Sequence, residues 1–293
     1  MTKTLYRHFE SAEELERQFM FVDTVPDMLR YVADYTAHSE KARSVLGGRL
    51  DIPYGPTLDE YVDIFPASRA GAPIMIFLHG GAWRMLSAKD YSFVALGPAA
   101  AGITSVVVNY SLCPKVGMDE IVRQARAAVV WTFRNATAFG ADPTQIYVIG
   151  HSSGAHLTAM CANTAWCADY GLPADIIKGA VPISGVFDLT PIRYTSHQIA
   201  LQLDGDIITR NSPYLLPLMR DGPPLFFSVG SLEPSEFMQQ ARDLSSRMKA
   251  VGRACEIFEQ PGLNHFQTMD GFERSDGELL NQVLAWIQGM KSV

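Results

Sequence analysis

Short apolar runs alternate with amphipathic segments of helical length along most of this sequence. Apolar or alternating runs predict strands over residues 61–65, 73–78, 103–109, 146–149, 177–183, 225–229 and 254–258. Apolar residues that recur every three or four positions predict helices over residues 118–139, 153–167, 235–251 and 275–290. Because continuous apolar strands need cover on both faces, this pattern predicts an α/β fold with a parallel sheet between helical layers.

The domain organisation follows from what does not interrupt this alternation. A chain of 293 residues is long enough for two domains, but no Pro/Ser-rich linker, charge block or repeat divides it. We therefore predict a single domain over residues 1–293, in which residues 1–49 form a helical N-terminal cap. Residues 188–222 fit the alternation poorly, because they lie between two predicted strands and contain Pro191, Pro213 and Pro217. This segment is either a lid or substrate-binding insertion, or an ordinary packed excursion.

The composition is acidic and apolar. There are 24 Lys and Arg against 31 Asp and Glu, a formal net charge of −7, and 47% of the residues are hydrophobic, which excludes a disordered chain. The basic residues are scattered, which argues against a nucleic-acid partner. The N-terminus lacks the apolar core of a secretory signal, and no apolar run approaches the roughly 20 residues that span a bilayer. We expect a cytoplasmic protein with a small-molecule substrate and no membrane association; a homodimer is compatible with the sequence.

A Gly-x-Ser-x-Gly motif lies between a predicted strand and a predicted helix. Gly150-His151-Ser152-Ser153-Gly154 directly follows the apolar run that ends at residue 149. At such a sharp turn the serine is presented to substrate, and glycines flank it because side chains there would clash with the strand and the helix. Ser152 is therefore the candidate nucleophile, the alternative being a glycine-rich loop packed for structural reasons.

His265 is the candidate general base for this serine. A serine hydroxyl is a weak nucleophile at neutral pH, so it needs a base and an acid that orients the base. When the serine lies on a strand-to-helix turn, both come later in the chain, from loops after the last strands. His265 lies between the predicted strand 254–258 and the final helix, whereas the other histidines lie in the cap, in residues 188–222 or in the glycine motifs.

Three carboxylates compete for the role of the acid. Glu233 comes just beyond the predicted strand 225–229 and is the preferred candidate. Glu236 lies one helical turn further on, where the helix dipole also favours a carboxylate for structural reasons. Asp188 follows the preceding strand and is alternatively a structural or substrate-pocket carboxylate.

A second glycine motif supplies candidate oxyanion donors. His79-Gly80-Gly81-Ala82-Trp83 follows the predicted strand 73–78, and glycines there let backbone N–H groups approach a substrate oxygen. We assign Gly80 and Gly81 to the oxyanion hole, which the N–H of Ser153 completes. Trp83 either lines the substrate pocket or packs under this loop, and His79 and Asp188 are further candidates for substrate contact.

The sequence gives no support for a metal or a cofactor. His151 and His156 are five residues apart with no HExxH glutamate between them, so a zinc site is not expected. The glycine motifs match neither the dinucleotide fingerprint nor the P-loop. We predict no metal and no cofactor, and we expect His156 to pack or hydrogen-bond on the nucleophile helix.

These motifs resemble the α/β-hydrolase superfamily, and within it the arylformamidase (kynurenine formamidase-like) and esterase group. HGGAW resembles the HGGxW form of the formamidase branch, and GHSSGAH resembles its GHSAGAH, with Ser153 in place of Ala. Stretches at residues 25–27, 54–55 and 109–114 also resemble that group, so the likeness runs from the cap to His265. The resemblance implies a mostly parallel, eight-stranded sheet flanked by helices, with no cofactor. It also implies an acid that is commonly Asp, at the position where this chain has Glu233.

Three functions fit the motifs. The first is a serine hydrolase that cleaves an N-formyl arylamine, such as N-formylkynurenine, through an acyl-enzyme. The second is a carboxylesterase acting on short acyl or aryl esters, because the same machinery cleaves esters more easily. The third is a non-catalytic binding module, which the retention of Ser152, His265 and both motif glycines argues against.

Overall fold

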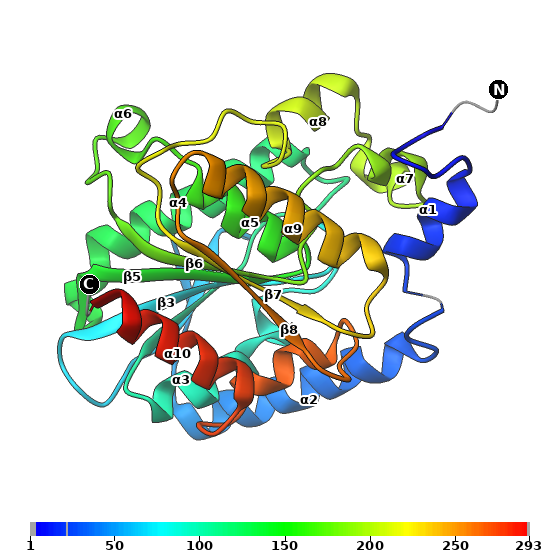
Figure 1. Cartoon of the computed structure of the whole chain (residues 1–293). Helices are drawn as coiled ribbons and strands as arrows, with labels where there is room; N and C mark the ends of the chain where they lie inside the picture. The colour runs from blue at the N-terminus through cyan, green and yellow to red at the C-terminus, as the bar shows by residue number, and fades with distance from the viewer. Residues whose placement is uncertain (1–3, 22, 292–293) are drawn as a thin grey trace.

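The computed structural model describes residues 4–21 and 23–291, so residues 1–3, 22, 292 and 293 of the predicted domain lie outside the described part. Its centre is an eight-stranded sheet in the order β1-β2-β4-β3-β5-β6-β7-β8 (Figure 1). β2 pairs antiparallel with β1 and with β4, and the remaining pairs are parallel. The strands are β1 (Arg49–Pro53), β2 (Tyr61–Phe65), β3 (Ala72–Leu78), β4 (Thr104–Val108), β5 (Ala141–His151), β6 (Ile177–Ile183), β7 (Leu225–Gly230) and β8 (Cys255–Gln260).

Two helical layers enclose the sheet (Figure 1). Alternate side chains of one strand enter different clusters: Ile74, Ile76 and Leu78 of β3 join the apolar cluster on one face, and Met75 and Phe77 join the cluster on the other. This two-sided burial is why the strands read as continuous apolar runs. One face is covered by α2 (Met28–Leu46), α3 (Leu96–Ala100) and α10 (Glu278–Lys291), and the other by α4 (Met118–Asn135), α5 (Ser153–Ala162) and α9 (Ser235–Ala250).

The predicted fold class is confirmed, and each predicted strand overlaps an observed one. β1 has no apolar run to predict it, because most of this edge strand is exposed. The helix predicted over residues 153–167 is wrong in its second half: α5 ends at Ala162, and α6 (Trp166–Tyr170) is separate. The break lies where Asn163 bonds to the backbone of Pro217 and Met219, so its side chain ties the chain to a neighbouring loop.

The N-terminal segment reaches the edge of the sheet at which the parallel strands end. α1 (Ala12–Phe19) begins with a capping box, in which the Ser11 hydroxyl accepts from the Glu14 amide and the Glu14 carboxylate accepts from the Ser11 amide. Leu15 and Phe19 of this helix are buried in the main apolar cluster. The cap boundary at residue 49 stays a prediction.

Residues 188–222 form a packed segment with short helical turns, η4 (Pro191–Tyr194), α7 (Gln198–Leu201) and α8 (Gly205–Asn211). Leu189, Leu201 and Ile208 are buried in the main apolar cluster. The segment also contacts the cap, because the Ser196 amide donates to the Glu16 carboxylate at 2.7 Å. Its role as a lid stays a prediction.

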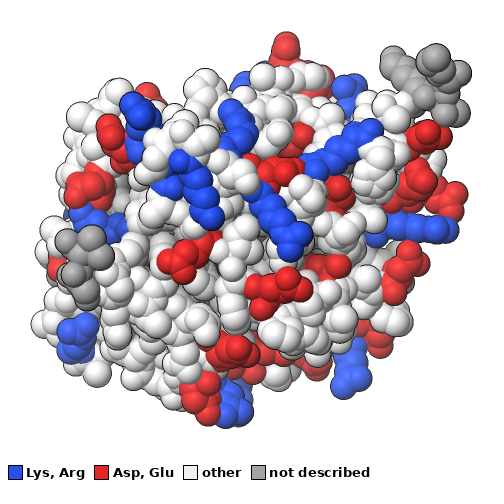
Figure 2. Space-filling model, viewed as in Figure 1, with Lys and Arg blue, Asp and Glu red and all other residues white. Residues whose placement is uncertain are grey.

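The surface mixes charges of both signs. On the face seen in Figure 2, Lys and Arg side chains are interspersed with Asp and Glu rather than gathered in a patch of one sign. Within the described chain, none of the helices combines the length and the apolar character needed to cross a bilayer.

α5 approaches the sheet so closely that two positions have no room for a side chain. A Cβ at Gly154 would lie 1.9 Å from the Leu78 carbonyl oxygen, and a Cβ at Gly150 would lie 2.2 Å from the Gly154 carbonyl oxygen. Both neighbours are backbone atoms, which cannot turn aside as a flexible side chain can. Glycine at both positions is therefore a requirement of this packing.

We predict that Gly154→Ala lowers the free energy of unfolding by at least about 2 kcal/mol, because the new methyl group overpacks the contact between α5 and β3. Gly289→Ala in α10 is the matched control, since nothing lies within 4 Å of its Cβ position. Alanine's higher helix propensity should leave that variant unchanged or up to about 1 kcal/mol more stable. Urea unfolding measures both, and a Gly154→Ala protein as stable as wild type would contradict the contact.

Candidate active site

The ends of the parallel strands gather the candidate residues at one edge of the sheet. Leu78 of β3 pairs with Gly150 of β5, and Gly230 of β7 pairs with Gln260 of β8, so these strands end at similar heights. In α/β sheets, the crevice beyond these carboxyl ends is where ligands bind. The loops that begin there carry the HGGAW motif, Ser152, Glu233 and His265.

Ser152 occupies the turn between β5 and α5 in a strained conformation, with φ 55° and ψ −118°. A non-glycine residue in such a region costs about 1–3 kcal/mol and persists only where the surroundings enforce it. Here the Ser152 amide donates to the Ile183 carbonyl of β6 at 2.9 Å, and the tight glycine contacts fix the start of α5. This backbone matches a nucleophile elbow.

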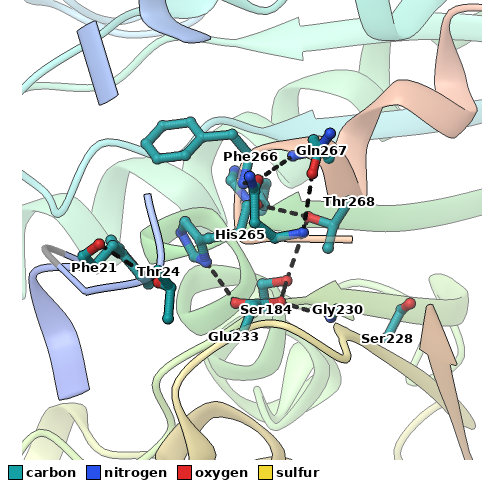
Figure 3. Close-up of polar contacts among 12 residues, drawn as sticks. Phe21, Thr24, Ser184, Ser228, Gly230, Glu233, His265, Phe266, Gln267 and Thr268 are labelled. Carbon is teal, nitrogen blue, oxygen red and sulfur yellow. Dashed lines mark hydrogen bonds and ion pairs between the residues drawn. The ribbon is translucent and has the colours of Figure 1, made fainter. Parts of the chain in front are cut away.

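Glu233 and His265 form a buried pair (Figure 3). His265 Nδ1 donates to Glu233 Oε2 at 2.6 Å, and the two side chains are 3% and 0% exposed. The other oxygen, Oε1, accepts from the Ser184 hydroxyl at 2.6 Å and from the Gly230 amide at 2.7 Å. Since three donors surround this carboxylate, its position and orientation are fixed.

The backbone of His265 is held as firmly as its ring. Its carbonyl oxygen accepts from His151 Nε2 at 2.9 Å and from the Thr268 hydroxyl at 2.8 Å. His151 Nδ1 in turn accepts from the Tyr91 hydroxyl at 3.1 Å. Burial, and next the charge of His265, lower the pKa of His151 well below its usual value, so this ring stays neutral and keeps the proton on Nε2.

The contacts of the three competing carboxylates differ. Glu233 reaches His265, whereas Glu236 faces Arg7 Nε at 3.5 Å from the N-terminal segment. Asp188 accepts from the Thr190 amide at 2.9 Å. Of these three acids, Glu233 has the position that orients the candidate base.

Ser152 and His265 line one cavity whose walls are mostly apolar. The HGGAW loop contributes Gly81, Ala82 and Trp83, and the segment 188–222 contributes Ile192 and His197. The remaining apolar lining comes largely from the cap and from helix α9: Phe19, Met20, Phe21, Met28, Val32 and Phe237. The cap therefore forms part of the site.

Phe21 covers the imidazole of His265. The two rings stack with centroids 3.9 Å apart and planes inclined by 22° (Figure 3). Phe21 lies beyond the end of α1 with φ 60°, and its carbonyl accepts from the Thr24 and Val25 amides. A tight turn in the cap thus places an aromatic ring on the candidate base.

The structure places two of the three predicted oxyanion donors in the cavity lining. Gly81 and Ser153 line the cavity, but Gly80 does not: a Cβ there would lie 2.7 Å from the Tyr91 hydroxyl, behind the loop. Ala82, which follows Gly81 with φ 51°, lines the cavity instead. In the described chain, the amides of Gly81, Ala82 and Ser153 donate no hydrogen bond, so they remain available to a substrate oxygen.

The three predicted substrate contacts also differ in position. Trp83 lines the cavity and is 2% exposed, and its Nε1 donates to His156 Nδ1 at 3.2 Å, so it both lines the pocket and packs. His79 and Asp188 are not among the cavity-lining residues: His79 stacks on Tyr110, and Asp188 is buried outside the lining. The described residues contain no group of three or more His, Cys, Asp or Glu that could hold a metal ion.

The sequence missed four groups of the site: Phe21, Ala82, His151 as a support, and Ser184. Ser184 directly follows β6 and has φ 54°, a placement that only the structure reveals. The sequence predicts residues 1–49 as a helical cap, but it does not indicate that this segment forms a wall of the pocket. The Gly-x-Ser-x-Gly motif contained His151, whose support of His265 depends on a contact 114 residues away in sequence.

The fold and this edge of the sheet define an α/β hydrolase. The chain belongs to the alpha/beta hydrolase fold family, whose match spans residues 75–269. It is 30% identical over 287 residues to kynurenine formamidase of Salmo salar, covering 93% of this chain and 95% of that protein. Kynurenine formamidase of Danio rerio is also 30% identical, over 272 residues, covering 89% and 91% of the two chains.

Solved structures agree with this assignment. The crystal structure of a putative thioesterase from Silicibacter sp. TM1040 has a TM-score of 0.77 and 26% identity, and the match covers 87% of this chain and 92% of that one. Together these similarities identify an arylformamidase-like amide or ester hydrolase.

We predict that acid destabilises this protein through its buried histidines. Burial lowers the pKa of His79 and of His156 to about 4 and that of His151 well below its usual value, whereas unfolded imidazoles titrate near about 6.5. Between these values the unfolded chain binds more protons, so the free energy of unfolding decreases as the pH is lowered, by up to about 1.4 kcal/mol per pH unit for each ring. Burial raises the pKa of Asp270 to about 6, which offsets about one ring.

Urea unfolding at about pH 7.5, 6.5 and 5.5 measures this slope. His156→Gln should reduce it by about 1 kcal/mol per pH unit, because one buried ring no longer titrates. His8→Gln is the control, since His8 is exposed and should leave the slope unchanged. Equal stability at about pH 7.5 and 5.5 would show that these rings are not protected from protonation.

Proposed function

We propose that this chain is a serine hydrolase that removes the formyl group from an N-formyl arylamine of the N-formylkynurenine type. The observation that carries the proposal is the aromatic-walled cavity that Ser152 and His265 share. Phe19, Phe21 and Phe237 suit the aryl group of such a substrate. The identity with kynurenine formamidases supports the formamide as the bond that is cleaved.

The proposed reaction has two steps. His265 Nε2 takes the proton of the Ser152 hydroxyl as Oγ attacks the formyl carbon, and the amides of Gly81, Ala82 and Ser153 stabilise the oxyanion. The C–N bond then breaks as His265 gives this proton to the aryl amine. Water attacks the formyl ester in the second step, with His265 as base, and formate leaves as Ser152 regains its proton.

Glu233 acts through the histidine. Its hydrogen bond keeps the neutral imidazole protonated on Nδ1, which leaves the Nε2 lone pair for the serine proton. During the reaction the ring becomes positively charged, and the buried carboxylate stabilises that charge. Ser184 and Gly230 hold the carboxylate against His265, so Glu can serve where the family commonly has Asp.

We predict that Glu233→Gln lowers kcat by about 10³- to 10⁴-fold with little change in KM, because an amide NH₂ no longer fixes the productive tautomer. Glu236→Gln is the matched control, one helical turn away, and should retain activity within about threefold. Steady-state hydrolysis of p-nitrophenyl acetate measures both variants. A reversed order of losses would transfer the role of the acid to Glu236.

The alternative function is a carboxylesterase acting on short acyl or aryl esters. The same groups cleave esters, whose alkoxide or phenoxide is a better leaving group than an amine. The apolar cavity accepts an aryl ester as well as an aryl formamide, so chemistry on the two bond types has to be compared directly.

The comparison is a panel of N-formylkynurenine and p-nitrophenyl esters, in which the ester series keeps the leaving group constant and varies the acyl chain. We expect kcat/KM for N-formylkynurenine to equal or exceed that for p-nitrophenyl acetate, and activity on esters to fall as the acyl chain lengthens. Ser152→Ala should abolish turnover of both classes and labelling by a fluorophosphonate probe. Formamide turnover many orders of magnitude below ester turnover would favour the carboxylesterase.

A further inference from the structure

Two polar side chains stand out in the otherwise apolar cavity. Most of the polar side chains that line it belong to the candidate catalytic edge, or to aromatic residues that already make hydrogen bonds: Ser152, Ser153, His151 and His265, and Trp83 and Tyr91. The others are Arg84 and His197. Arg84 is the one Lys or Arg in the lining, and no Asp or Glu of the described chain is part of it. A positive charge in such a wall needs either solvent or an anion.

Arg84 has no carboxylate partner in the described chain. None of the ion pairs among the described residues involves it, whereas Arg7 and Arg123, for example, pair with glutamates. Its backbone is fixed, because its amide donates to the Gly81 carbonyl at 3.0 Å, in the turn whose Ala82 and Trp83 have φ 51° and 57°. Arg84 is exposed, and its side chain extends from a rigid turn beside the candidate oxyanion donors without a hydrogen bond to any described residue.

His197 is a second, independent sign of a ligand at this end of the cavity. It is 6% exposed, and Nδ1 is buried without a hydrogen-bond partner in the described chain. An unpartnered buried ring nitrogen is costly unless a ligand or water satisfies it. Burial, and next the positive charge of Arg84, lower the pKa of His197, so the two groups act on one another and the ring is neutral at pH 7.

We propose that Arg84, with His197 beside it, binds a carboxylate on the substrate and thereby selects aryl formamides that carry an amino acid or other acidic side chain. Guanidinium pairs with carboxylate through two parallel hydrogen bonds, which orients as well as attracts. Because the neutral ring of His197 bonds to the Phe19 backbone through its other nitrogen, the unpartnered Nδ1 is an acceptor. It therefore suits the ammonium of an amino-acid head group, beside the carboxylate at Arg84. This inference rests on the proposed function, and it adds the residue that recognises the end of the substrate far from the scissile bond.

The test compares N-formylkynurenine with 2-formamidoacetophenone, which keeps the aryl formamide and the ring carbonyl and lacks the amino acid. In wild type we expect kcat/KM to favour the acidic substrate. Arg84→Met should lower this preference by roughly 10- to 100-fold, mainly through KM, as expected for loss of a charge-assisted pair. The preference of Arg84→Lys for the acidic substrate should lie between those of wild type and Arg84→Met, because lysine keeps the charge but loses the paired geometry.

Arg220→Met is the matched control, because Arg220 is an exposed, unpaired arginine outside the cavity lining. It should keep the wild-type preference. The proposal is overturned if Arg84→Met keeps the wild-type ratio, or if it changes KM for both formamides equally.

A binding measurement separates this inference from the proposed function. 4-Oxo-4-phenylbutanoate carries the aryl ketone and a carboxylate but no formamide, so it should inhibit p-nitrophenyl acetate hydrolysis competitively. Arg84→Met should raise its inhibition constant by roughly 10-fold or more, whether or not formamides are substrates. An unchanged constant overturns the carboxylate site; a raised constant with no formamide turnover retains the site and overturns the proposed function.

Discussion

The backbone contact between α5 and the end of β3 is the constraint on which the active site depends. At Gly154 the helix touches the carbonyl of Leu78, the last residue of β3 before the HGGAW loop. The helix that presents Ser152 and the Ser153 amide is therefore held directly against the loop that carries Gly81. A larger separation would move the proposed nucleophile away from the proposed oxyanion donors, and such displacements lower reaction rates steeply. The strained φ of Ser152 is a consequence of the same packing.

The sequence predicts the parts of this arrangement that are encoded locally. Buried strands are recognisable as apolar runs, and Ser152 and His265 follow strands in a fixed chain order. Which carboxylate orients the candidate base depends on the tertiary fold. Glu233 precedes α9 and folds back to the Gly230 amide, whereas Glu236 lies on the helix and meets an arginine from the distant N-terminal segment. One helical turn separates them in sequence, and only the fold directs them to different partners.

Gly80 shows a second limit of reasoning from sequence. The two motif glycines look equivalent, but the tight turn of the HGGAW loop directs Gly80 toward Tyr91 and carries Gly81 and Ala82 into the cavity. The walls of the pocket are still harder to predict from the sequence. Phe21 reaches His265 through a turn with positive φ, and helical periodicity in the cap does not indicate such a turn. A contact across 244 residues of sequence leaves no local pattern, since Phe21 looks like any other apolar residue of its own segment.

The proposed carboxylate site and the proposed oxyanion hole belong to one turn. The Arg84 amide donates to the Gly81 carbonyl, so one hydrogen-bonded turn carries both the Arg84 side chain and the amides of Gly81 and Ala82. A substrate held by its carboxylate at Arg84 would have its orientation fixed relative to the oxyanion donors. Binding energy from a group that does not react is then available to orient the formyl carbon at Ser152, which lowers the entropic part of the barrier. An amide is harder to cleave than an ester. An enzyme that cleaves amides with the catalytic groups of an esterase therefore benefits most, in rate, from a contact with the substrate far from the scissile bond.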